Sequence, residues 1–201
     1  MFTLTCENLH LEAQGEIVFS RLSFSSTAGT ILYIRGSNGS GKSSLLRIIA
    51  GIQLAEIGDI KINNVNINQL QKSYISYIGH ELGINLMLSV KDNLLFWAKL
   101  YDAYEGLDAT IFYFGLQELL ESRAYDLSAG NRKKLALARL FLANRKIWLL
   151  DEIDNNLDES NKLVLYNAII SKASMGGIVI IASHSKEFTK NAQILYMEDY
   201  A

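Results

Sequence analysis

The chain opens with alternating apolar and polar residues and continues with longer, unbroken apolar runs. Residues 2–11 and 16–24 alternate with a period of two, which is typical of antiparallel strands, and Gln14-Gly15 between them favours a turn. The unbroken runs are typical of parallel strands that are covered on both faces. They lie at 30–35, 146–150 and 178–182, and shorter strand signals lie at 58–67, 74–79 and 193–197. The pattern predicts a mainly parallel α/β core sheet with an antiparallel β subdomain.

A second pattern, with apolar residues at helical spacing, fills the middle of the chain. Val90, Leu94 and Trp97 follow one another at intervals of three or four residues, and 111–120 and 132–144 continue in the same style. We therefore expect a helical subdomain inserted into a single domain. Its predicted bounds are about 82–144, and those of the surrounding core are 1–81 and 145–201.

The composition narrows the range of partners. The 201 residues, 49% of them hydrophobic, are enough to bury the core of one domain. Lys+Arg 19 against Asp+Glu 21 leaves a formal net charge of -2, so we expect no nucleic-acid partner, since that would require a basic surface. Cys6 is the only cysteine, which excludes an intrachain disulfide. Because no apolar run approaches about 20 residues, we expect neither a membrane span nor direct insertion into lipid.

A glycine-rich segment connects the strand expected at 30–35 to a helix expected at 44–50, which Gly51 would cap. The segment has the spacing G-x-x-x-x-G-K-S, in which glycines let backbone N–H groups face inward and the helix start adds its positive dipole end. It predicts a polyphosphate site in which Lys42 supplies a positive charge to the β- and γ-phosphates and the Ser43 hydroxyl can bind Mg²⁺. The expected contact residues are Gly36, Ser37, Asn38, Gly39, Ser40, Gly41, Lys42, Ser43 and Ser44.

Two adjacent carboxylates, Asp151 and Glu152, end the apolar strand expected at 146–150. Adjacent strand residues point to opposite sides, so the two groups can divide their roles. We expect Asp151 to face the Mg²⁺ and Glu152 to polarise an attacking water as general base. The alternative is that both only cap the next turn together with Asp154.

Two further segments carry candidate chemistry. Ser128 is a good N-cap for the helix that follows, and this helix start can hold an anion or can be an ordinary capped helix with a basic face. His184 comes directly after the strand expected at 178–182, where ligands bind in α/β sheets. On the residues alone, both signals are ambiguous.

In their order and separations, these segments resemble the ATP-binding subunits of ABC transporters over essentially the whole chain. The similarity is to the Walker A loop at 36–43, the signature motif at 127–131, Walker B at 149–152, the D-loop at 156–158 and the switch histidine at His184. The resemblance implies a P-loop ATPase of the ABC type that works as a pair of copies. Each ATP would lie between the Walker A loop of one copy and the signature motif of the other. Ser128 and the Gly130 N–H would then hold the γ-phosphate, while His184 and Glu152 would position the attacking water.

The chain departs from the family pattern at two places. Where the family has a glutamine near the metal, this chain has His80, or Glu81 if the alignment shifts by one, so His80 is a candidate metal ligand. The aromatic residue that stacks on adenine in the family is not evident either. Gln14 falls near that position, and Phe19 is a weak substitute.

One branch of the family is particularly similar. Residues 77–80, Gly83-Ile84 and 92–97 resemble the haem-exporter ATP-binding subunits of bacterial cytochrome c maturation, the CcmA branch. The resemblance implies a peripheral subunit on the cytoplasmic face of the bacterial inner membrane, bound to permease subunits of a haem-handling complex. Hydrolysis would drive haem export or the release of haem-loaded chaperone. The alternatives are the ATPase of another small transporter, for lipid or lipoprotein, and a soluble ABC scaffold for metal-cluster assembly.

Overall fold

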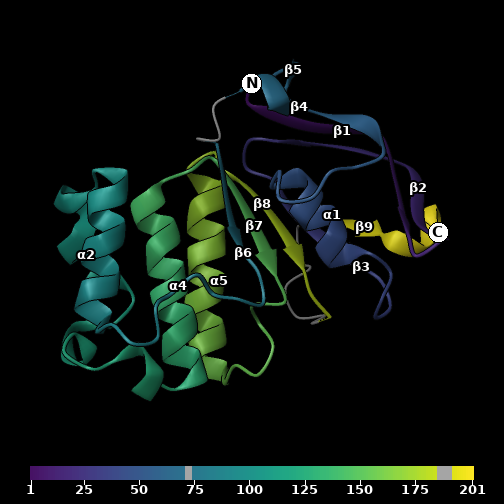
Figure 1. Ribbon diagram of the computed structural model, residues 1–201. Helices are drawn as coiled ribbons and strands as arrows, with labels where there is room; N and C mark the ends of the chain where they lie inside the picture. The colour runs from purple at the N-terminus through teal and green to yellow at the C-terminus, as the bar shows by residue number, and fades with distance from the viewer. Residues whose placement is uncertain (71–73, 185–191) are drawn as a thin grey trace.

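The computed structural model describes residues 1–70, 74–184 and 192–201 (Figure 1). Within these residues, two β-sheets are combined with five α-helices and short 3₁₀ turns. The predicted α/β class, with a parallel core sheet and an antiparallel β-sheet, is confirmed. No helix in the described part of the chain is long and apolar enough to cross a membrane.

The antiparallel sheet has the strand order β2-β1-β4-β5. Its strands are β1 (Thr3–Ala13), β2 (Glu16–Thr27), β4 (Ile57–Ile62) and β5 (Val65–Asn66). The predicted turn between β1 and β2 is confirmed, because Gln14 and Gly15 both have positive φ, as a tight hairpin turn requires. The sheet therefore starts as the hairpin that the alternating pattern predicts.

The parallel sheet has the order β6-β7-β8-β3-β9. Its strands are β3 (Ile31–Arg35), β6 (Ile75–Ile78), β7 (Ile147–Asp151), β8 (Ile178–Ala182) and β9 (Gln193–Tyr196). All residues of β7 and β8 are buried, which explains their unbroken apolar sequence. The carboxyl ends of β3, β7 and β8 meet at one edge, so the segments that follow these strands gather there.

The five helices are α1 (Lys42–Ile49), α2 (Val90–Tyr101), α3 (Leu107–Tyr113), α4 (Ala129–Ala143) and α5 (Glu159–Ser174). Helix α1 ends at Ile49 and is capped by Ala50, one residue before the predicted cap. The N–H groups of Gly51 and Ile52 bond back to the carbonyls of Ile48 and Arg47. Gly51, with φ 69°, is therefore the left-handed residue just beyond the cap. The 3₁₀ turns are Ile67–Gln69, Tyr104–Gly106, Gln117–Leu119, Ala124–Asp126 and Met197–Tyr200.

The expectation of continued helix over 111–120 is wrong in part. Helix α3 ends at Tyr113, Gly115 takes φ 62°, and only a 3₁₀ turn follows. The apolar residues of this stretch are still used, because Phe114 and Leu116 are fully buried against the helices. Apolar spacing predicted burial here, while the glycine decided where the helix stops.

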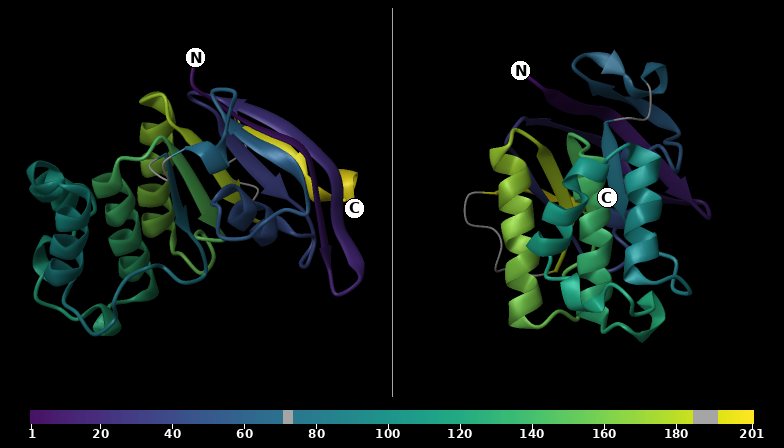
Figure 2. Two further views of the ribbon diagram at one scale, coloured as in Figure 1. Left: turned by 45° about the horizontal axis from the view of Figure 1, so that its top comes forward. Right: turned by 90° about the vertical axis from the view of Figure 1, so that its left-hand side faces the viewer.

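The parallel sheet separates two hydrophobic cores. Trp148 and Leu150 of β7 face the core beneath α2, α4 and α5, and Ile147 and Leu149 face the core shared with α1 and the antiparallel sheet. Figure 2 shows this layering, with α4 and α5 on one side of the parallel sheet and α1 with the antiparallel sheet on the other. Residues from both layers can therefore contribute to a site at the edge where β3, β7 and β8 end.

Candidate nucleotide site

The glycine-rich loop between β3 and α1 has no room for side chains at two of its glycines. A Cβ at Gly41 would lie 2.6 Å from Val18 Cγ1, and Gly41 has φ 90°. A Cβ at Gly36 would lie 2.3 Å from Ser40 Oγ. The predicted glycine spacing is therefore required by the close packing of the loop against β2 and against itself.

Lys42 begins α1 and folds back across the loop. Its side-chain amine donates hydrogen bonds to the carbonyl oxygens of Gly36 and Ser37, each at 2.8 Å, and the residue is only 5% exposed. The ammonium group is thus held inside the curve of the loop, where it can meet an anionic ligand without first being ordered. The loop is further tied down by the Ser37 N–H, which donates to Glu198 Oε1 at 2.8 Å.

A hollow of about 520 Å³ opens beside this loop. It brings together six of the predicted contact residues and the predicted general base. Its lining consists of Ala13, Val18, Asn38, Gly39, Gly41, Lys42, Ser43, Ser44 and Glu152. The predicted site residues thus come from the end of β3, the start of α1 and the end of β7, and the β1–β2 hairpin supplies the remaining wall.

Asp151 is buried at the end of β7 and accepts two hydrogen bonds. One comes from Ser43 Oγ at 2.9 Å and the other from the Tyr77 hydroxyl at 3.1 Å. The pairing of Ser43 with Asp151 supplies the hydroxyl and carboxylate oxygens that suit Mg²⁺. Tyr77 was not predicted from the sequence as part of this site, because its role depends on β6 lying beside β7. Burial, followed by the nearby Asp151 charge, raises the pKa of the Tyr77 hydroxyl above its ordinary value.

Glu152 leaves the strand through a left-handed backbone conformation, with φ 52°. Its N–H donates to the Ala182 carbonyl at 2.9 Å, and its Oε1 lies 3.6 Å from His184 Nε2. Its other carboxylate oxygen accepts a hydrogen bond from Asn155 Nδ2 at 2.9 Å. The two residues predicted to handle the attacking water are therefore adjacent, because β7 and β8 are neighbours and end at the same level.

A buried polar contact below these groups connects the same two turns. The Ser183 hydroxyl donates to Asp154 Oδ2, and Arg35 Nη1 donates to the Ser183 carbonyl at 3.3 Å. Both Ser183 and Asp154 are buried. Asp154 therefore holds the turn after β7 against the turn after β8. Asp151 bonds outside this turn, to Ser43 and Tyr77, whereas Glu152 also accepts a hydrogen bond from Asn155 within it.

The predicted signature residues lie elsewhere, at the start of α4. Ser128 is exposed, and its Oγ accepts the N–H of Asn131 at 3.2 Å, so the predicted N-cap is confirmed. Gly130 is buried against α5, where a Cβ would come within 2.3 Å of Asn161 Nδ2. Within one copy, Ser128 and Gly130 do not line the hollow beside Lys42.

The two departures from the family pattern can also be placed. His80 and Glu81 are exposed in the loop after β6, and the oxygens of Asp151 accept from Ser43 and Tyr77 instead, so metal binding by His80 stays a prediction. Phe19 is completely buried beneath Gly41 and is not open to an adenine ring. Gln14 is exposed at the hairpin turn, close to the Ala13 wall of the hollow.

Comparison with known proteins agrees with this geometry. The ABC transporter family matches residues 19–155. The cytochrome c biogenesis ATP-binding export protein CcmA of Rickettsia typhi is 44% identical over 198 residues, which cover 98% of this chain and 100% of that protein. The CcmA of Rickettsia bellii is 47% identical over 180 residues, covering 90% and 92% of the two chains, and that of Paramagnetospirillum magneticum is 35% identical, covering 99% and 95%.

The fold has close counterparts among solved structures. An ABC transporter ATP-binding protein of Pyrococcus furiosus superimposes with a TM-score of 0.86 at 26% identity and covers 99% of both chains. The similarity thus extends over the glycine-rich loop, the buried carboxylate and the helix that starts at Ser128. The chain belongs to the ABC transporter family, in the group of the cytochrome c biogenesis ATP-binding export proteins.

Proposed function

We propose that this chain is the ATP-hydrolysing subunit of a membrane ABC complex in cytochrome c maturation, where it drives haem export or the release of haem-loaded chaperone. The relatives that cover nearly its whole length are export proteins of cytochrome c biogenesis. The observation that carries the enzymatic part is the buried Lys42 amine, held across the phosphate loop beside the Ser43–Asp151 pair. Positive charge and oxygen ligands for a metal then lie side by side, as phosphoryl transfer requires.

Each group has a distinct role in the proposed hydrolysis. The loop N–H groups and Lys42 would hold the β- and γ-phosphates, and Ser43 and Asp151 would hold Mg²⁺, which would supply positive charge to neutralise the phosphates. Glu152 accepts a proton from the attacking water as general base. His184, 3.6 Å from Glu152, orients that carboxylate and contacts the γ-phosphate. Tyr77 holds Asp151 from the side opposite Ser43.

The second half of the site comes from a second copy of the chain. Helix α4 has 15 residues, and Ser128 is its N-cap. This helix start offers the exposed Ser128 hydroxyl, the Gly130 N–H and the positive end of the helix dipole. In the proposed pair, these groups hold the γ-phosphate of the ATP that is bound to the partner's loop. ATP therefore joins the two copies, and its hydrolysis releases them.

We propose that the membrane partner docks on the predicted helical subdomain, at about 82–144. A groove of about 490 Å³ runs between the loop after β6 and α2, and it is lined by Gly83, Ile84, Asn85, Leu86, Leu88, Asn93, Phe96 and Trp97. Phe96 is 56% exposed there, and Leu86 is 40% exposed. A groove with exposed apolar side chains such as these suits a short helix of a permease subunit. We place the chain at the cytoplasmic face of the bacterial inner membrane, bound through this groove.

Purification of the tagged chain from its native membranes tests the proposal. We expect haem-handling membrane subunits to co-purify and to be identified by mass spectrometry. Phe96→Asp should release the chain from those subunits, because it places a charge in the groove, and should leave ATP binding intact. Phe112→Asp is the matched control, since Phe112 is 76% exposed on α3 outside the groove. Recovery of the wild-type chain with a soluble assembly complex would contradict the proposal.

A further inference from the structure

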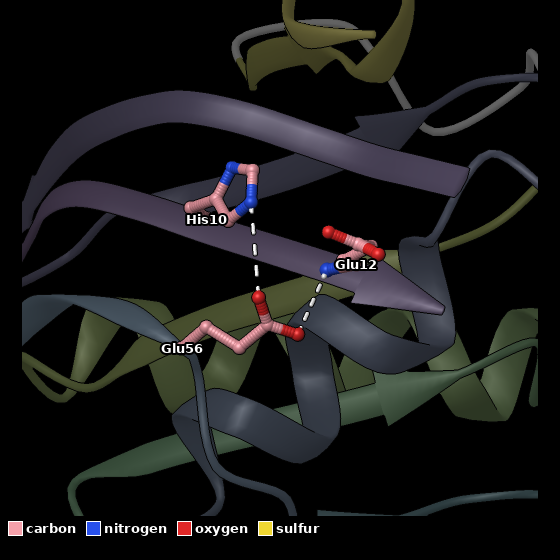
Figure 3. A group of neighbouring side chains, drawn as sticks. All are labelled: His10, Glu12 and Glu56. Atoms are coloured by element: carbon pink, nitrogen blue, oxygen red, sulfur yellow. Dashed lines mark hydrogen bonds and ion pairs between the residues drawn. The ribbon is translucent and has the colours of Figure 1, made fainter. Parts of the chain in front are cut away.

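Three potential metal ligands converge on the exposed face of the antiparallel sheet, next to the nucleotide hollow (Figure 3). His10 and Glu12 belong to β1, and Glu56 directly precedes β4. One nitrogen of the histidine and one oxygen of each carboxylate all lie within 4.8 Å of one another. The proposed ATPase mechanism uses none of these residues.

A β-bulge turns the first two ligands outward. Asn8 adopts a left-handed conformation, with φ 51°, and the pairing of β1 with β4 shifts between Glu7 and His10. The bulge changes the phase of burial along the strand, because the buried residues are Leu4 and Cys6 before it and Leu9 and Leu11 after it. Without the extra residue, His10 and Glu12 would point into the core. Bulges that re-aim side chains in this way are typical of functional positions.

Glu56 is held in place by the strand that carries the other two ligands. Its N–H donates to the His10 carbonyl at 3.1 Å, and its Oε1 accepts the Glu12 N–H at 3.2 Å. Its second oxygen, Oε2, then faces His10 Nε2 at 3.8 Å. This separation is too long for a hydrogen bond. Two atoms that each lie about 2.0–2.1 Å from a tetrahedral Zn²⁺ are about 3.4 Å apart, so a closure of a few tenths of an ångström would let both atoms bind one ion.

The imidazole of His10 is oriented from its other side. Nδ1 lies 3.2 Å from Ser20 Oγ on β2, and the side chain is only 18% exposed. When Nδ1–H donates to this hydroxyl, the lone pair on Nε2 points toward Glu56. Metal-binding histidines are commonly oriented in this way by a partner on the second ring nitrogen.

The charges of the cluster also favour a cation. Two carboxylates face one histidine, and in the part of the chain that the structure describes no lysine or arginine pairs with Glu12 or Glu56. We propose that His10, Glu12 and Glu56 bind one Zn²⁺, with water as the fourth ligand. The nitrogen donor favours zinc over Mg²⁺ and Ca²⁺, which prefer oxygen ligands. This site is separate from the Mg²⁺ of the nucleotide and does not depend on the proposed ATPase function.

A bound ion would connect two segments that lead to the nucleotide site. β1 continues from Glu12 into Ala13, which lines the hollow, and Glu56 lies on the segment that leaves α1, the helix that begins with Lys42. Zinc would therefore fasten the β1–β2 hairpin to the chain behind the phosphate loop. We expect stabilisation of this wall of the hollow rather than any direct part in hydrolysis.

Measurements of zinc binding test the proposal. They use the tag-free full-length chain, from which metal has been removed with a chelator and to which no nucleotide is added. Competition with a chromophoric zinc chelator should give one Zn²⁺ per chain, and Co²⁺ should give the visible absorption bands of a low-coordinate nitrogen and oxygen site. Zinc at about 100 times its Kd should raise the Tm by roughly 5 °C. Mg²⁺ at the same concentration should produce neither the Tm shift nor displacement of cobalt.

Variants separate this site from other zinc-binding groups. His10→Gln should weaken zinc binding by about tenfold or more and remove the Tm shift, and Ser20→Ala should weaken it by up to about tenfold. Glu7→Gln is the matched control from outside the cluster and should bind zinc like the wild type. If His10→Gln does not fold, as judged by circular dichroism, Glu12→Gln replaces it, because Glu12 is exposed. Undetectable zinc binding, or equal binding by wild type and His10→Gln, would overturn the proposal.

Discussion

The phosphate loop and the signature segment both place serine and glycine at the start of a helix, yet they differ in where their partners lie. In the loop, Lys42 bonds to the carbonyls of Gly36 and Ser37, and Ser43 bonds to Asp151. In the signature segment, the Ser128 hydroxyl is exposed and, within residues 1–70, 74–184 and 192–201, accepts only the capping N–H of Asn131. The loop is assembled within one chain, whereas the signature segment presents an exposed hydroxyl and a helix start at the surface.

The helix starts differ in their shape as well as in their contacts. Helix α1 starts beneath a loop that curves over its N-terminus, so an anion there is enclosed on several sides. Helix α4 starts at the surface, with Ser128 and Ala129 exposed and Gly130 packed on Asn161. An exposed helix N-terminus gives weak selectivity by itself. The difference explains why we propose that the second copy completes the site.

Replacing Lys42, the charged group of the phosphate loop, should have the largest effect on ATPase turnover. Among the residues that the structure describes, Lys42 is the only one that brings an ammonium group to the hollow. For Lys42→Ala we therefore expect ATPase turnover to fall by roughly 10³-fold and ATP binding to weaken. Lys134→Ala is the control, since this lysine lies in α4 and not in the hollow. Steady-state phosphate release and ATP titration measure the two effects. Near-normal turnover in Lys42→Ala would contradict the assignment of the loop.

Replacing Glu152, the proposed general base, should have the next largest effect. Glu152→Gln keeps the shape of the side chain but cannot take the water proton, so turnover should drop about 10²-fold or more while ATP still binds. Because ATP then persists between the copies, the variant should also accumulate as a dimer in size-exclusion chromatography with light scattering. Turnover equal to that of the wild type would remove Glu152 from the catalytic role.

A bulky charge on the signature segment tests whether that segment completes the site of a second copy. Ser128→Arg blocks the exposed face of α4, and the loss of a bond to a charged phosphate should cost roughly tenfold to 10²-fold in turnover. ATP binding by a single copy should persist, since Ser128 does not line its own hollow. Ser174→Arg, at the far end of α5, serves as the matched control. Full activity of Ser128→Arg would count against a shared site.

The smallest effect is expected at Tyr77, which donates a hydrogen bond to Asp151, the proposed metal-binding carboxylate. Tyr77→Phe removes one hydrogen bond to Asp151 and leaves the bond from Ser43, so we expect a decrease of about threefold to tenfold in turnover. The decrease should shrink as Mg²⁺ is raised, because a less well-held Asp151 weakens metal binding. A Mg²⁺ titration of ATPase activity distinguishes this outcome from a general loss of stability, which would not respond to Mg²⁺.

Local motifs were the part of the site that could be read from the chain. The spacing of Gly36, Gly41, Lys42 and Ser43 follows from the geometry of a single turn between strand and helix, so contiguous residues carry the whole signal. The carboxylates at 151–152 and the histidine at 184 were also placed at strand ends by their apolar runs. That Glu152 and His184 lie 3.6 Å apart depends on the strand order, which apolar runs do not specify.

Residues outside the motifs were missed for the same reason. Tyr77 reaches Asp151 because β6 pairs with β7, and Arg139 of α4 donates to the Tyr77 carbonyl at 3.0 Å across 62 positions of sequence. Phe19 was considered for stacking on adenine, yet it is buried beneath Gly41. The one signal available for Tyr77 was its place just before the histidine loop, and that signal pointed to His80 instead.

The sequence by itself determined the strand types, the phosphate loop and the family resemblance, because these depend on periodicity and on short contiguous spacings that survive without knowledge of the fold. Only the tertiary structure decided which side chains meet. It joined Ser43 to Asp151, Glu152 to His184, and His10 to Glu56. The strand order, the left-handed turn at Glu152 and the bulge at Asn8 bring these pairs together. These features are set by the long-range packing of the two sheets, and no short stretch of the sequence specifies that packing.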